Sequence, residues 1–236
     1  MGGPALAIVT GLQGEARLAL RAVLKAGLGG GDVDVVCAGP GPERARVAAE
    51  GQVARGARML LSFGVAGALV PELEPGAILV PAMVAEAGSE PLATDQIRTQ
   101  MSVLALAAAG PLARGPLLST REVIVSAAQK AELARATGAV AVDLESYAVG
   151  TVALKAGVPF AVLRAIADPA GRAIPPAALA GMTESGNVNP WNVVKGLAGT
   201  PRDVPELMAL ARDNARAMAS LGRAARLALP LLLVGR

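Results

Sequence analysis

Short apolar runs alternate with longer amphipathic segments along most of this 236-residue chain. Short apolar runs predict buried strands, and apolar residues at helical spacing predict helices that cover a sheet. The predicted strands are residues 5–10, 33–38, 59–63, 77–81, 139–142 and 160–167. The predicted helices are residues 15–26, 42–55, 146–156, 191–197 and 204–226. This alternation is typical of an α/β protein with a central mixed sheet flanked by helices.

The predicted strand–helix–strand unit at residues 139–168 places a carboxylate at the end of each strand. Glu145 follows the first strand, and Asp168 ends the second. Ligands of open α/β sheets bind outside the carboxyl ends of parallel strands, so both carboxylates are expected to face one ligand. Each also has a structural alternative. Glu145 suits a helix N-terminus, and Asp168 suits a loop cap before Pro169.

The composition narrows the class of protein. Apolar residues make up 53% of the chain and aromatic residues only 2%, so small side chains must fill the core. The length is that of one domain, and we expect a single domain over residues 1–236. The net charge of +3 comes without a basic run interleaved with aromatic residues. Nucleic-acid binding is therefore not expected.

Metal, secretion and membrane-spanning functions are disfavoured in the same way. The chain has one cysteine and no histidine, so we expect no zinc site, no other metal and no internal disulfide. The start of the chain lacks the basic flank and apolar run of a signal peptide. No uncharged apolar run reaches the length of a membrane span. We expect a cytoplasmic protein without a cofactor.

Two motifs in the 139–171 segment carry a resemblance to a known family. The segments Val142-Asp143-Leu144-Glu145-Ser146 and Leu163-Arg164-Ala165-Ile166-Ala167-Asp168 agree in order and spacing with motifs of the nucleoside phosphorylase and nucleosidase superfamily. The resemblance implies a three-layer sandwich and cleavage of an N-glycosidic bond. It also implies a homo-oligomer, since family members usually assemble.

The resemblance assigns a role to each acid. Glu145, with Leu144 beside it, would bind the ribose hydroxyls, and Asp168 would place a proton on N7 of a purine leaving group. Arg164 would be structural and pair near these acids. The chemistry fits, because a carboxyl group in an apolar setting can act as a general acid. Ionised carboxylates also accept strong hydrogen bonds from hydroxyl groups.

Two further segments resemble the family's substrate-binding regions. The segment Gly64-Val65-Ala66-Gly67 is expected to be a tight turn whose backbone N–H groups approach a sugar or an anion. Family nucleosidases often have Ser where Val65 stands. Val123 and Ile124 fall where the family places base-pocket residues, in place of the aromatic residue that often stacks on the purine.

The attacking group stays open between water and phosphate. Glu15 matches the position of the acid that activates water in hydrolytic members. It also suits the first turn of a helix as an ordinary acid. Arg17, Gly41 and Arg44 are the residues expected to bind phosphate in a phosphorolytic enzyme, with inorganic phosphate as co-substrate. The loop that contains Gly41 leads into a helix N-terminus, which can hold an anion.

The segments at residues 168–179 and 186–189 resemble the hopanoid-associated phosphorylase branch. That branch is implicated in removing adenine from adenosylhopane, whose 5′ carbon bears a triterpenoid. A nucleoside with a lipid-like 5′ group would need an apolar channel. The apolar stretch at residues 227–234, with Arg223, Arg226 and Arg236 around it, either touches the inner membrane surface or forms a core helix interrupted by Pro230.

Three functional hypotheses follow. The first is an enzyme that releases adenine from a 5′-hydrophobically substituted adenosine, with adenosylhopane as the expected substrate. The second is a methylthioadenosine or adenosylhomocysteine nucleosidase. The third is a non-catalytic nucleoside-binding protein, which the presence of both Glu145 and Asp168 disfavours.

Overall fold

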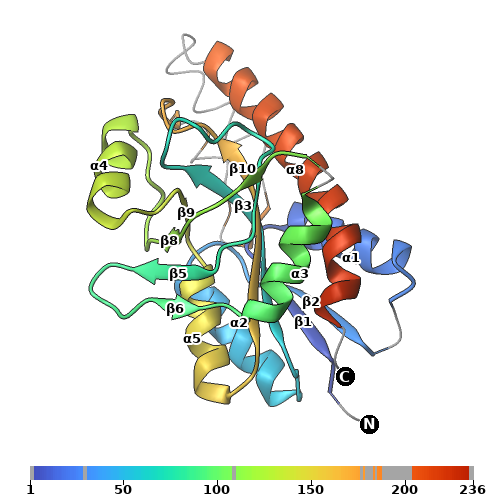
Figure 1. Cartoon of the computed structure of the whole chain (residues 1–236). Helices are drawn as coiled ribbons and strands as arrows, with labels where there is room; N and C mark the ends of the chain where they lie inside the picture. Colours follow the sequence, from blue (N-terminus) through green and yellow to red (C-terminus); the bar gives the residue numbers. More distant parts are fainter. Residues whose placement is uncertain are drawn as a thin grey trace.

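The computed structural model describes residues 3–28, 31–107, 110–175, 178, 183, 185–187 and 204–233. In these residues, one mixed sheet of ten strands is flanked by helices (Figure 1). The strands are β1 (Leu6–Thr10), β2 (Val33–Cys37), β3 (Leu60–Ala68), β4 (Ile78–Leu79), β5 (Met83–Glu86), β6 (Leu92–Ala93), β7 (Leu112–Ala113), β8 (Leu117–Ser119), β9 (Ala141–Asp143) and β10 (Phe160–Asp168). The helices are α1 (Gln13–Lys25), α2 (Pro42–Ala54), α3 (Gln96–Leu106), α4 (Ala127–Thr137), α5 (Ser146–Ala156) and α8 (Val204–Leu232).

The predicted α/β fold with a mixed sheet is confirmed, and its centre is the long strand β3. Strands β1 and β10 pair with β3 in parallel, and β2 extends the parallel group beyond β1. β9 pairs with the carboxyl end of β3 in the antiparallel direction, at Gly67 and Ala68. β3 therefore contacts β1 along its first half and β9 at its end.

The direction of β9 corrects the prediction for residues 139–168. β9 and β10 lie on opposite sides of β3, and they run in opposite directions, because β10 is parallel to β3 and β9 is antiparallel. The expected pair of parallel strands is thus wrong. Because β9 is antiparallel to β3, the chain that follows β9 runs back alongside β3, and Glu145 lies in this part of the chain.

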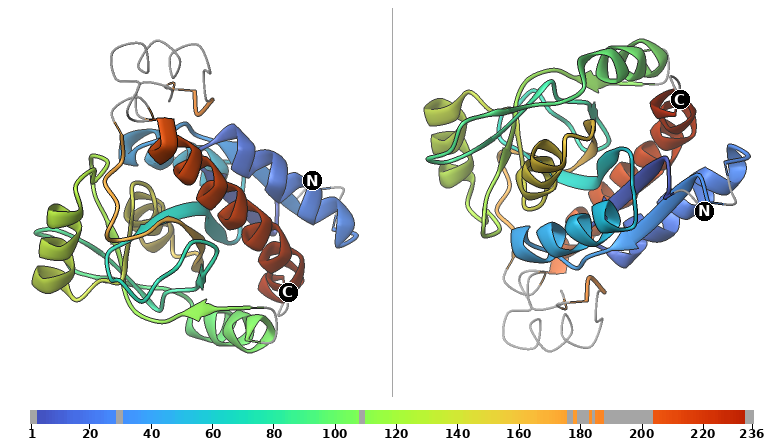
Figure 2. Two further views of the ribbon diagram at one scale, coloured as in Figure 1. Left: turned by 90° about the horizontal axis from the view of Figure 1, so that it is seen from above. Right: turned by 90° about the horizontal axis from the view of Figure 1, so that it is seen from below.

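The helices form two outer layers around the sheet (Figure 2). In β1, Leu6 and Ile8 pack into a core with α1 and α8. Ala7 and Val9 pack into a second core with α2 and α5. This alternation follows from the two-residue repeat of a strand, and it confirms the predicted layers. The small side chains on these faces let the helices pack closely on the sheet.

The C-terminal helix α8 is longer than predicted. It continues past residue 226 and includes Pro230 near its end. Leu221, Leu229 and Leu232 are buried in the core, whereas Leu227 is 44% exposed. Pro230 has no backbone N–H, so the last part of the helix lacks one hydrogen bond to the preceding turn. Among the described residues, no helix is both long and apolar enough to cross a membrane.

The predicted tight turn at residues 64–67 is wrong, because these residues belong to β3. They are small because buried side chains approach this part of the strand, as described below. The predicted helix at residues 191–197 lies outside the described residues. Residues 82–138, for which no element was predicted, contain β5 to β8, α3 and α4.

Candidate active site

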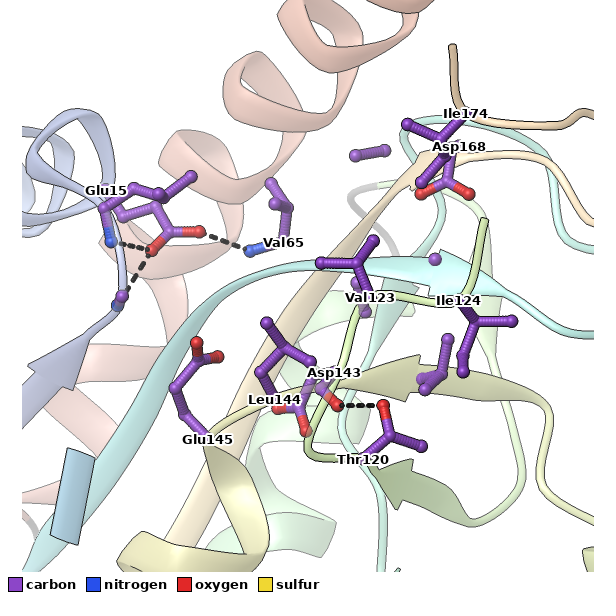
Figure 3. Close-up of a pocket in the computed structure, with 16 residues that line it drawn as sticks. Glu15, Val65, Thr120, Val123, Ile124, Asp143, Leu144, Glu145, Asp168 and Ile174 are labelled. Atoms are coloured by element: carbon purple, nitrogen blue, oxygen red, sulfur yellow. Dashed lines mark hydrogen bonds between the residues drawn. The ribbon is translucent and has the colours of Figure 1, made fainter. Parts of the chain in front are cut away.

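A cavity of about 180 Å³ lies at the carboxyl ends of β3 and β10 (Figure 3). Apolar side chains make up much of its wall, and four carboxylates line it. These carboxylates belong to Glu15, Asp143, Glu145 and Asp168. No lysine or arginine is among the described residues that line it.

The cavity brings together most residues predicted from the sequence. Those that line it are Glu15, Val65, Ala66, Gly67, Val123, Ile124, Leu144, Glu145 and Asp168. In Figure 3, Glu15 and Glu145 lie toward one end of the cavity and Asp168 lies toward the other, with Val123 and Ile124 nearer to Asp168. A ligand that reaches all three carboxylates must therefore extend along the cavity.

Glu15 is held in the first turn of α1 by three backbone groups. Its Oε1 accepts a hydrogen bond from the N–H of Val65 at 2.8 Å. Its Oε2 accepts from Leu12 at 2.9 Å and from Gly11 at 3.2 Å. The side chain is 3% exposed, and burial raises its pKa, an effect opposed by Arg164 and by these hydrogen bonds. Glu15 is thus more than an exposed first-turn acid, because it joins α1 to β3.

Glu145 immediately precedes α5 and projects beside β3. Its side chain makes no hydrogen bond that caps the helix. Its Oε1 instead accepts from the N–H of Gly41 at 3.0 Å, at the start of α2. Burial, opposed mainly by Arg164, raises the pKa of Glu145 to about 7. A carboxyl group with this pKa changes its charge near neutral pH.

Arg164 forms the ionic centre beneath the cavity, and its expected pairing with nearby acids is confirmed. It is 1% exposed. Its Nε donates to Asp143 Oδ2 at 2.8 Å, and its Nη2 lies 3.6 Å from Glu145 Oε2. Nη2 also donates to the hydroxyls of Ser62 and Ser146. The surrounding carboxylates raise the pKa of Arg164, although its burial opposes this.

Asp168 ends β10 and forms an ion pair with Lys130 of α4. Its carboxylate also lies against the backbone of β3, where Gly67 leaves room. A Cβ atom at Gly67 would lie 3.0 Å from Asp168 Oδ1. Asp168 is 8% exposed and Lys130 is fully buried. The expected alternative of a simple loop cap does not describe this arrangement.

The remaining predicted residues do not line the cavity. Gly64 lies beneath it, where a Cβ atom would come within 2.5 Å of Glu15 Oε1. Gly41 donates its backbone N–H to Glu145. Arg17 and Arg44 are exposed, and they donate to the backbone oxygens of Gln13 and Pro40. The three residues proposed for phosphate binding therefore lie outside the cavity wall.

Sequence reasoning missed Lys130 and the structural role of Ser119. Ser119 Oγ donates to Asp143 Oδ1 at 2.5 Å and accepts from the N–H of Tyr147 at 2.9 Å. Nothing in the pattern around Lys130 distinguishes it from the exposed residues of a polar helix. The described residues also contain no cluster of three or more acidic, histidine or cysteine side chains arranged to hold a metal ion.

Comparison with known proteins identifies a family whose model matches most of the chain. The family model described as "Phosphorylase superfamily" matches residues 11–195. That range contains Glu15, Glu145 and Asp168. No curated protein matches the sequence significantly.

Several solved structures share the fold. A Helicobacter pylori 5′-methylthioadenosine/S-adenosylhomocysteine nucleosidase matches with a TM-score of 0.71 and 17% identity, over 98% of this chain and 99% of that chain. The Neisseria meningitidis nucleosidase of the same name, in complex with methylthio-immucillin-A, has a TM-score of 0.65 and 17% identity, over 94% of this chain and 98% of that chain. The Helicobacter pylori futalosine hydrolase has a TM-score of 0.64 and 18% identity, over 83% of this chain and 97% of that chain. At these identities the likeness establishes the fold.

Proposed function

The chain belongs to the Phosphorylase superfamily, as an enzyme of its nucleosidase and phosphorylase class, and from that premise we propose that it hydrolyses the N-glycosidic bond of an adenosine-type nucleoside and releases adenine. The observation that carries the proposal is the cavity in which Glu15, Glu145 and Asp168 converge. Relatives of the same fold include nucleosidases of methylthioadenosine and adenosylhomocysteine.

The reaction assigns one role to each of three carboxylates, those of Asp168, Glu145 and Glu15. Asp168 gives a proton to N7 of the purine, so that the base leaves neutral when the bond from C1′ to N9 breaks. Glu145 accepts hydrogen bonds from the ribose hydroxyls. Glu15 takes a proton from the attacking water, which forms the new bond to C1′. The sugar becomes cationic in the transition state, and nearby carboxylates stabilise that charge.

Water is favoured over phosphate by the charge of the cavity wall. The wall carries four carboxylates and, in the described part of the chain, no lysine or arginine. Lys130 and Arg164 lie behind the wall and already pair with Asp168 and Asp143, and Arg17 and Arg44 lie outside it. In the described part of the chain, a phosphate dianion would therefore meet carboxylates without a further cation, and like charges repel. These observations support hydrolysis.

The substrate that we propose carries an apolar 5′ group, and adenosylhopane is the specific expectation. Its support is the resemblance of residues 168–179 and 186–189 to the hopanoid-associated branch, together with the apolar cavity wall. A lipid-like 5′ group would bring the enzyme to the surface of the inner membrane, and the exposed Leu227 and Arg226 on α8 are candidates for that contact. We also propose a homo-oligomer, on the resemblance alone.

A substrate panel tests the proposal. Adenine is measured chromatographically after incubation with adenosylhopane, methylthioadenosine and adenosylhomocysteine. We expect adenine from adenosylhopane at the highest kcat/KM. Release from methylthioadenosine alone would discard the lipid substrate and keep the reaction. Release from none of the three would contradict the enzymatic proposal and favour a nucleoside-binding protein.

A further inference from the structure

Lys130 is the one residue of α4 that is fully buried. The other residues of this helix are exposed or half-buried, whereas the lysine side chain reaches the carboxyl end of β10. Lysine is almost never fully buried unless it is paired. Its position therefore requires a partner, and the partner is the carboxylate assigned to the leaving group.

The ammonium group of Lys130 has an acceptor for each of its three donors. Nζ contacts Asp168 Oδ2 and donates to the carbonyl oxygens of Pro169 at 3.1 Å and Arg172 at 3.0 Å. The lysine thus fixes both the carboxylate and the turn that follows it. A further hydrogen bond joins this segment to the chain just before α4. The backbone N–H of Ile174, a residue of the cavity wall, donates to the carbonyl oxygen of Val125 at 2.9 Å.

A buried ion pair is weak support for stability, because removing two charges from water is costly. The arrangement has a chemical use. A carboxyl group that donates a proton becomes negative at that moment, and a positive charge already in place stabilises the product of the transfer. Lys130 is placed to do this for Asp168, and it reaches no other carboxylate of the cavity in the described hydrogen bonds.

We propose that Lys130 is the positioning residue for leaving-group protonation: it orients Asp168 and stabilises the carboxylate that forms when the base departs. This inference rests on the proposed hydrolysis. Before the step, Asp168 carries a proton from solvent on Oδ1, the oxygen that Lys130 does not contact. In the step, the electron pair of the bond from C1′ to N9 passes to the base, and this proton passes from Asp168 to N7. Asp168 is left as a carboxylate beside the ammonium of Lys130, which keeps its own protons. Solvent returns a proton to Asp168 before the next turnover.

The test compares Lys130→Met with wild type on two substrates. Methylthioadenosine needs a proton on its base, whereas 4-nitrophenyl riboside has a leaving group that departs without one. We expect kcat for methylthioadenosine to fall by about 100-fold or more, with KM little changed. The rate with nitrophenyl riboside should change much less. Lys130→Arg keeps the charge and should recover part of the lost kcat.

Lys155→Met serves as the control, because it makes the same chemical change at an exposed position on α5. It should keep the wild-type ratio of the two substrates. If Lys130→Met does not fold, Lys130→Gln is measured in its place, because it keeps a hydrogen-bond donor and removes the charge.

The outcomes separate this inference from the proposed function. Wild-type enzyme that releases no base contradicts the proposed function. Active wild-type enzyme with an unchanged kcat in Lys130→Met overturns the role of Lys130 and leaves hydrolysis intact. An equal loss on both substrates, or a loss confined to KM, would also overturn it, since either result indicates a purely structural lysine.

Discussion

Glu145 Oε2 lies 3.6 Å from Arg164 Nη2, and the same nitrogen lies 2.6 Å from Asp143 Oδ2. The buried guanidinium of Arg164 therefore pairs with two carboxylates, and it lies closer to that of Asp143. Burial raises the pKa of Glu145 to about 7, although Arg164, which also pairs with Asp143, opposes the rise. This relationship makes the charge of Glu145 depend on pH in the range where the enzyme would work.

The raised pKa of Glu145 predicts a pH-dependent stability. Between its ordinary pKa of 4.5 and about 7, the folded state binds a proton that the unfolded state has released. The free energy of unfolding should therefore fall as pH rises through this range. Glu145→Gln removes this contribution. Relative to wild type, the variant should gain on the order of 2 kcal/mol between pH 5 and pH 8.

Urea unfolding at both pH values measures this difference. Glu50→Gln, on the exposed side of α2, is the matched control and should follow the wild-type pH dependence. A constant difference between Glu145→Gln and wild type across the range would contradict the raised pKa.

Gly64→Ala should displace the groups beneath the cavity. A Cβ atom at this position would lie 2.4 Å from Arg164 Nη1 and 2.5 Å from Glu15 Oε1, so both side chains must move. Small displacements of reacting groups cost about 100-fold in rate, and we expect a loss of kcat/KM of that order. Gly51→Ala in α2 is the control, because nothing lies within 4 Å of its added carbon. Equal activity of the two variants would contradict the described packing.

Glu15→Gln should lower both activity and stability. Both carboxylate oxygens accept backbone hydrogen bonds, so the amide NH₂ of glutamine must face at least one N–H group. A buried donor left without an acceptor costs about 1–3 kcal/mol, which thermal unfolding measures. Loss of the group that accepts a proton from water should lower kcat by about 100-fold or more. Turnover near the wild-type level would remove Glu15 from water activation.

Asp168→Asn should nearly abolish base release, and it should also lower the free energy of unfolding, because the buried ammonium of Lys130 loses its counter-charge. The amide oxygen of asparagine can still accept from Lys130, but the side chain has no acidic proton to give. We expect kcat to fall by about 100-fold to 10,000-fold, with an unchanged circular dichroism spectrum. Asp213→Asn, which removes the partner of Arg172, is the control and should stay active. Wild-type turnover in Asp168→Asn would refute its role as the acid.

The sequence predicted the layers and most of the site, for physical reasons visible in particular residues. The run from Phe160 to Ala167 is apolar except for Arg164, because β10 is buried along its whole length, and Asp168 at its end lies at the cavity. Local pattern indicated Glu145, which follows an apolar strand and precedes a helix. Glu15 was found from the resemblance to the hydrolytic members of the family.

What the sequence could not give depended on long-range pairing. The direction of β9 is set by its partners β3 and β8, which no local pattern reveals. The small residues at 64–67 are typical of a turn, but they are small because Glu15, Arg164 and Asp168 approach β3 there. Lys130 was missed because a buried ion pair becomes visible only when α4 is placed against β10.

The most direct test of the proposed hydrolysis is the fate of the sugar in H₂¹⁸O. Wild-type enzyme is incubated with methylthioadenosine or adenosylhopane, with and without phosphate, and the products are identified by mass spectrometry. Hydrolysis predicts free adenine and a sugar that carries one ¹⁸O at C1, at a rate that phosphate does not raise. A sugar 1-phosphate formed only when phosphate is present would contradict hydrolysis, and intact nucleoside under both conditions would contradict the proposed reaction itself.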